Sequence, residues 1–154
     1  MSLPFPPFPF PQLNYLLLLT YYLTKMSLFS RIKPQETFHI TIKAVAKMLK
    51  IPPKMIVKIE KWDYVLFVHR KDIGGQFVSY RRLRNWQNAV AMKIRTCCKK
   101  DKLDMLWLTI ENDRKKYAKQ YKDAYGKFVK RLWNEQWEKV VARSEAKVNR
   151  YVRT

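Results

Sequence analysis

The spacing of apolar residues in the segment from 34 to 53 predicts an early amphipathic helix. Its apolar members recur at intervals of three and four positions: Phe38, Ile42, Val45 and Leu49. This spacing places them on one face of a helix. Lysines recur on the other side: Lys43, Lys47, Lys50 and Lys54. Pro34 suits the first turn of a helix, and Pro52 and Pro53 end one, so we expect the helix between these prolines.

The next segment, from 54 to 83, has the pattern of a β-sheet. It is rich in Val, Ile, Tyr, Phe and Trp, and residues 62–69 alternate as strands do. Gly74 and Gly75, two of the three glycines in the chain, predict a turn, because glycine accepts positive φ freely. We expect residues 77–80 to return as the second strand. The prediction is a β-hairpin near 55–80, with a helix over 55–69 as the competing interpretation.

After residue 84 the pattern is helical. Stripes of apolar residues at helical spacing follow one another: Trp86, Val90 and Ile94, then Leu103, Ile110 and Tyr117, then Phe128, Leu132, Val140, Val148 and Tyr151. We expect Asp101 to cap the second of these helices, and Gly126 to end or interrupt it. The predicted fold class is mostly α with a small β-hairpin (α+β), in which an early helix and the hairpin precede long C-terminal helices.

Residues 1–25 are expected to form an apolar extension, and residues 26–154 a single basic, mainly helical domain, with Met26 as an alternative start. The first 24 residues carry no charged side chain, and residues 4–11 are mostly Pro and Phe, which favours extended chain. Residues 13–24 are apolar but only about twelve long, whereas a membrane span needs roughly 20. An uncleaved anchor is the alternative. Residues 26–35 resemble the mature end of a mitochondrial presequence.

The net charge of the chain bears on what the protein binds. The chain has 32 Lys and Arg against 12 Asp and Glu, a formal net charge of +20. A free soluble domain of this size does better with a magnitude of roughly 2 to 8, and a larger charge opposes compaction unless a polyanion screens it. We therefore expect a polyanionic partner, either nucleic acid or an anionic membrane surface.

Catalytic and metal-binding patterns are scarce. The sequence has no GxSxG, HExxH, Walker A or GxGxxG motif. His39 and His69 are isolated, and Cys97 and Cys98 are adjacent, a placing that suits neither a disulfide between distant segments nor a zinc site. We expect no enzymatic activity, no metal, no cofactor and no small-molecule substrate.

The segment QFVSYRRLRNWQN, residues 76–88, combines basic and aromatic residues. Phosphate binding needs Lys and Arg on a shared surface, and stacking on unpaired bases needs exposed rings or guanidinium planes. We expect Phe77 and Trp86 to belong to the core. The candidate RNA contacts of this segment are Tyr80, Arg81, Arg82 and Arg84.

Further candidate RNA contacts lie on the predicted helices. They are Lys43, Lys47 and Lys50 on the early helix, and Arg114, Lys115, Lys119, Lys130 and Arg131 on the C-terminal helices. No RNP1, KH, zinc-finger or basic-zipper pattern occurs. We therefore expect recognition of RNA shape and phosphates rather than of base sequence.

This layout resembles that of accessory proteins of organellar ribosomes. The resemblance rests on the extension from Pro4 to Pro11, the dense Arg and Lys of 81–84 and 114–131, and the tryptophans of the C-terminal helices: Trp107, Trp133 and Trp137. It implies a structural rRNA-binding component of a mitochondrial ribosome, located in the matrix and packed against ribosomal RNA and neighbouring ribosomal proteins. The alternative is a small basic subunit of a membrane protein complex, anchored by residues 3–23. A general DNA-binding protein is the third interpretation.

Overall fold

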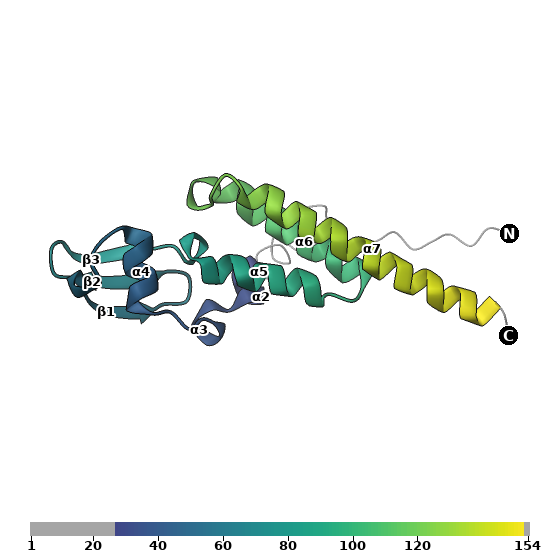
Figure 1. The fold of residues 1–154 in the computed structure, drawn as a ribbon, viewed down its shortest axis with the longest axis horizontal. Helices are drawn as coiled ribbons and strands as arrows, with labels where there is room; N and C mark the ends of the chain where they lie inside the picture. Colours follow the sequence, from purple (N-terminus) through teal and green to yellow (C-terminus); the bar gives the residue numbers. More distant parts are fainter. Residues whose placement is uncertain (1–26, 153–154) are drawn as a thin grey trace, which may run out of the picture.

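A small antiparallel sheet lies at one end of the chain's fold and a set of long helices at the other (Figure 1). A computed structural model describes residues 27–152, so the predicted extension over residues 1–25 lies outside the described residues. The helices are α2 (Leu28–Ile32), α3 (Pro34–Thr37), α4 (Ile42–Leu49), α5 (Arg84–Thr96), α6 (Lys100–Lys116) and α7 (Tyr125–Val152). The strands are β1 (Ile56–Lys61), β2 (Leu66–Arg70) and β3 (Gly74–Val78). Single-turn 3-10 helices lie at η1 (Pro53–Met55), η2 (Tyr80–Arg82) and η3 (Ala118–Gln120). The predicted α+β fold class is confirmed.

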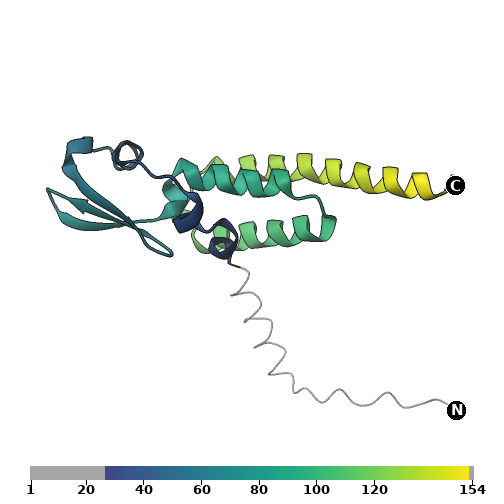
Figure 2. The same ribbon diagram turned by 90° about the horizontal axis from the view of Figure 1, so that it is seen from below.

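The three strands lie in the order β1–β2–β3. Leu66, Val68 and Val78 point to one face of the sheet and are fully buried. Figure 2 shows α4 over one face, while no described element covers the other. The predicted hairpin is thus part of a larger sheet, and the competing helix over 55–69 is wrong. The added turn lies at 62–65, where the Trp62 backbone N–H donates to the Val65 carbonyl at 3.0 Å.

The early helix predicted between the prolines is two separate helices, α3 and α4. Phe38 adopts an extended backbone and is buried. Thr41 then caps α4, because its hydroxyl accepts a hydrogen bond from the Ala44 backbone N–H at 3.2 Å. A threonine side chain that bonds its own backbone in this way favours a helix start over a helix interior.

The C-terminal half is a set of three packed helices. α5 and α6 both pack against α7, and the three helices contribute these buried residues to the core: Trp86, Val90, Ile94, Leu103, Leu106, Ile110, Val129, Leu132 and Val140. Asp101 lies in the first turn of α6, but Lys99 holds the cap position. Gly126 lies in the first turn of α7 rather than ending α6. α7 continues past the other helices (Figures 1 and 2), leaving Val148 and Tyr151 exposed.

A cluster of aromatic rings joins the sheet to the helices. Phe29 of α2 lies 4.8 Å from Trp86 of α5, and Phe38 lies 6.0 Å from Tyr80 of η2, measured between ring centroids. The Asn85 side chain adds a hydrogen bond to the His39 carbonyl at 3.0 Å. Aromatic burial of this kind fixes the position of η2, from which the basic segment at 81–84 begins.

Candidate nucleic-acid interface

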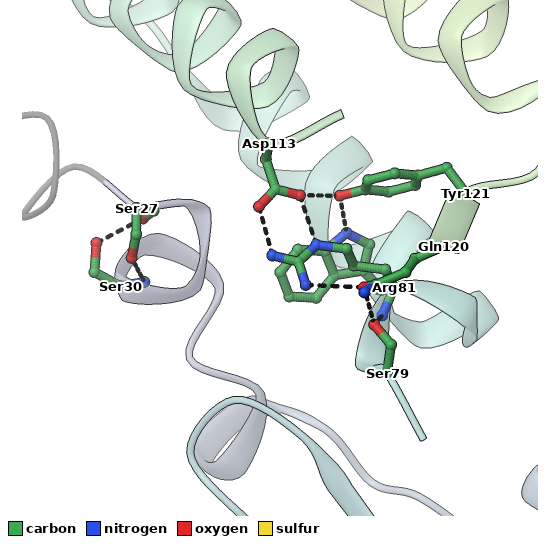
Figure 3. A network of polar contacts seen from close by, with 8 residues as sticks. Ser27, Ser30, Ser79, Arg81, Asp113, Gln120 and Tyr121 are labelled. Carbon is green, nitrogen blue, oxygen red and sulfur yellow. Dashed lines mark hydrogen bonds and ion pairs between the residues drawn. The ribbon is translucent and has the colours of Figure 1, made fainter. Parts of the chain in front are cut away.

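Arg81, the first arginine of the basic segment, points into the protein. Its Nε donates to Asp113 Oδ2 at 2.7 Å and its Nη2 donates to Oδ1 at 2.6 Å, as Figure 3 shows. Only 6% of the Arg81 side chain is exposed, and Asp113 is buried as well. The guanidinium of Arg81, predicted to contact RNA phosphates, is therefore already paired with a carboxylate and almost fully buried, which disfavours Arg81 as a phosphate contact.

Aromatic rings surround this ion pair. The Arg81 guanidinium carbon lies 3.7 Å from the centroid of the Tyr117 ring and 4.6 Å from that of Phe29, close enough for cation–π attraction. Burial is the largest single effect and acts to lower the pKa of the Arg81 guanidinium, but the hydrogen bonds and the charge of Asp113, with smaller contributions from Tyr121 and Tyr117, together outweigh it and the pKa is raised. The arginine therefore remains charged in the interior.

Tyr121 extends the network to α5. Its hydroxyl donates to Asp113 and accepts a hydrogen bond from Trp86 Nε1 at 3.1 Å. Burial and the neighbouring charge of Asp113 raise the pKa of Tyr121 well above its ordinary value. The hydroxyl is thus held in its neutral form, in which it is able to donate to the carboxylate.

Gln120 closes the network between η2 and η3. Its side-chain oxygen accepts hydrogen bonds from the Ser79 hydroxyl at 2.6 Å and from Arg81 Nη1 at 3.2 Å. These bonds tie the segment before α5 to the turn after α6, although the two lie about forty positions apart in the chain. We call this region the η2–η3 junction.

Tyr80, the aromatic candidate RNA contact, is also fully buried and presents no exposed ring face to a base. Its hydroxyl donates to the Trp62 carbonyl at 2.7 Å, and its ring lies in the joint between sheet and helices. Burial raises the pKa of Tyr80 to about 12. Tyr80 therefore anchors the 62–65 turn rather than contacting a partner.

The remaining basic residues of the junction face solvent. Arg82, Arg84, Lys115 and Lys119 are all exposed. None of these four makes an ion pair with an acid among residues 27–152. The buried network brings these cations from two distant segments to the same end of the helices. This grouping of unpaired positive charge is suited to phosphate binding.

The candidate RNA contacts on the other helices differ in their exposure and in whether they pair with an acidic residue. Lys43 and Lys47 are exposed on the side of α4 opposite the buried Val45, and Lys50, the residue that caps the end of α4, is exposed as well. The described residues offer these three lysines no acidic partner within ion-pair distance. Of the others, Arg114 is half-buried and pairs with Glu111 at 3.1 Å, Arg131 lies 3.8 Å from Glu135, and Lys130 is exposed.

Phe77 lies on the surface, contrary to the sequence prediction. It was expected in the core, yet 60% of it is exposed, because it points to the uncovered face of the sheet. Phe67 of β2 is its cross-strand partner, and their ring centroids lie 5.0 Å apart. β2 carries large apolar residues on both faces, Leu66 and Val68 on one and Phe67 on the other. The alternation therefore did not show which of the two faces is buried.

A hollow of about 660 Å³ lies between α2, the 62–65 turn and α6. Its apolar lining includes Phe29, Tyr64 and Leu108, and the Arg81–Asp113 pair also contributes to the wall. Because these two charged groups satisfy each other, the hollow offers a mainly apolar surface.

Among residues 27–152 no helix is both long and apolar enough to cross a membrane. In the same part of the chain, no three His, Cys, Asp or Glu side chains gather as a metal site requires. A comparison of the chain with models of protein families, with curated proteins and with solved structures found no match.

Proposed function

We propose that this protein binds RNA phosphates as a structural component of a ribonucleoprotein. The observation that carries the proposal is the η2–η3 junction, where Arg82, Arg84, Lys115 and Lys119 face solvent without acidic partners among the described residues. Each phosphate contact releases condensed counterions, so a rigid group of free cations binds a polyanion strongly at low salt. The buried Arg81–Asp113 pair supports the proposal because it fixes the surface on which these cations lie.

Salt-dependent binding of the full chain to a structured RNA tests the proposal. The variant Arg82→Gln/Arg84→Gln/Lys119→Gln removes three charges at the junction. A matched control, Lys139→Gln/Arg143→Gln/Lys147→Gln, removes three exposed charges from α7. We expect the junction variant to lower the magnitude of the slope of log K against log salt by about 0.7–0.9 for each lost phosphate contact, and the control to change it less. Equal slopes for both variants would show diffuse charge attraction instead.

The second part of the proposal concerns which ribonucleoprotein the protein belongs to. We propose a mitochondrial ribosome, on the strength of the net charge of +20 and the sequence layout. Sedimentation of the tagged protein from detergent-solubilised mitochondria, with and without RNase, tests this. Migration with a ribosomal subunit that collapses after RNase supports it. Migration with a membrane complex that RNase does not alter would instead favour the alternative, a small basic subunit of such a complex.

A further inference from the structure

The uncovered face of the sheet presents a cluster of aromatic side chains, which we call the aromatic face: Trp62, Phe67, His69 and Phe77. The Trp62 and Phe67 rings are stacked, with centroids 5.3 Å apart and planes at 22°. Phe77 meets Trp62 edge-on at 5.4 Å, and the His69 ring lies 4.7 Å from Phe67. Despite these contacts, 44% of Trp62 and 60% of Phe77 are exposed. Such exposure of large rings side by side is characteristic of a binding surface.

Glu60 holds two of these rings in place. Its carboxylate accepts hydrogen bonds from Trp62 Nε1 at 3.1 Å, His69 Nε2 at 2.9 Å and Lys58 Nζ at 2.9 Å. Because the indole and the imidazole bond to the same carboxylate, the bonds to Glu60 fix the two rings relative to each other. The carboxylate also has its charge offset by Lys58, so the face does not present an unpaired negative charge to a phosphate.

Gly75 makes room for the Phe67 ring. A Cβ atom at position 75 would lie 2.3 Å from Phe67 Cζ and 2.8 Å from Cε2. The ring therefore lies directly over the backbone of β3, at a position where any other residue would push it away. Together with the Glu60 bonds, this close approach means that the rings are arranged before a ligand arrives, which lowers the entropy cost of binding.

From this arrangement we infer that the aromatic face stacks on unpaired bases of single-stranded RNA. Flat rings with exposed π-faces suit bases, and stacking tolerates any base sequence. A polyanion is also the partner that a chain of charge +20 attracts. This inference rests on the proposed function: the cations hold phosphates, and the aromatic face distinguishes single strands from duplexes.

The test compares the full chain's affinity for a fluorescent oligouridine and for an RNA duplex with the same number of phosphates. Phe77→Ala removes an exposed ring and leaves the core intact. Val57→Ala is the matched control, since Val57 is a strand residue with the same exposed fraction, 60%. We expect Phe77→Ala to weaken oligouridine binding by about 5- to 100-fold and duplex binding by less than about twofold, while Val57→Ala changes neither affinity.

Salt separates stacking from charge. We expect Phe77→Ala to weaken oligouridine binding by a similar factor at about 0.05 M and about 0.3 M salt, because stacking releases no counterions. If Phe77→Ala binds oligouridine as tightly as the unmodified chain does, the aromatic face does not stack on bases. The proposed function would still hold, because RNA binding itself is intact. Loss of a bound partner protein on Phe77→Ala, with RNA affinity unaltered, assigns the face to protein recognition. No binding of either RNA by the unmodified chain overturns both.

Discussion

The guanidinium of Arg81 and the carboxylate of Asp113 face each other in a two-bond ion pair, although 32 positions separate them in the chain. The pair joins η2, at the end of the sheet, to α6. Two charges taken out of water are stable only while each satisfies the other. The orientation of the whole η2–η3 junction therefore depends on this contact.

Asp113→Asn should destabilise the fold strongly. The amide has no negative charge, so the buried guanidinium of Arg81 loses its counter-charge and one of its two acceptors. Breaking a buried pair from one side costs about 3–5 kcal/mol of unfolding free energy, and urea denaturation followed by circular dichroism measures it. Asp104→Asn, an exposed carboxylate on the same helix, is the control and should change stability by less than about 0.5 kcal/mol. Similar effects of the two variants would contradict the buried pair.

Removal of the Tyr121 hydroxyl tests the second link of the network. Tyr121→Phe leaves the Trp86 indole N–H without its acceptor and takes one donor from Asp113. A buried polar group left unpaired costs about 1–3 kcal/mol, which thermal unfolding should register. Tyr117→Phe is a suitable control, because it keeps the ring that lies against Arg81. If the Tyr117 variant lost as much stability as the Tyr121 variant, the network would not be the cause.

The different burial of Arg81 and Arg82 could not be predicted from the sequence. The two are neighbours of the same type, yet Arg81 is buried and Arg82 is exposed. The difference is set by Asp113, whose position relative to η2 follows only from packing of α6 against the rest. The stripe Trp86, Val90 and Ile94, by contrast, was predictable, because its members are buried on one face of one continuous helix.

Phe77 and Thr41 show two other limits. β2 carries large apolar residues on both faces, so alternation alone did not reveal which face α4 covers, and Phe77 was assigned to the core. Thr41 fits the helical spacing of its neighbours, but its hydroxyl caps α4 instead of continuing the helix. In both cases the spacing of apolar residues indicated the right type of secondary structure. A contact that the spacing does not encode then decided which face is buried or where the helix begins.

Gly75→Ala should disturb the aromatic face with little loss of stability. The new Cβ would overlap the end of the Phe67 ring, and the ring has open solvent into which it can turn. We expect a cost of about 1 kcal/mol in unfolding free energy, together with a loss of oligouridine affinity like that of Phe77→Ala. Val57→Ala, the exposed strand control already used with Phe77→Ala, should leave oligouridine binding unchanged. If Gly75→Ala leaves the oligouridine affinity unaltered, the placement of the Phe67 ring does not contribute to RNA binding.

Acid should release Trp62 from Glu60 only at very low pH. Hydrogen bonds from Lys58, Trp62 and His69, in that order of effect, lower the pKa of Glu60 from 4.5 to about 2. Because the folded pKa lies below the unfolded one, the stabilisation is fully present above about pH 4.5 and is lost as the pH falls through about 2. The indole N–H signal of Trp62 in ¹⁵N–¹H spectra, assigned with Trp62→Phe, should therefore hold its position down to pH 4.5 and move near pH 2.

Glu60→Gln supplies the control for this titration. The amide oxygen still accepts a hydrogen bond but does not ionise, so the Trp62 signal of this variant should lose its step near pH 2. The other tryptophans report on global unfolding, because acid denaturation would move all indole signals together. A Trp62 transition centred near pH 4.5 in the unmodified chain would show that Glu60 is an ordinary exposed carboxylate. In that case the aromatic face would not be held in place by Glu60.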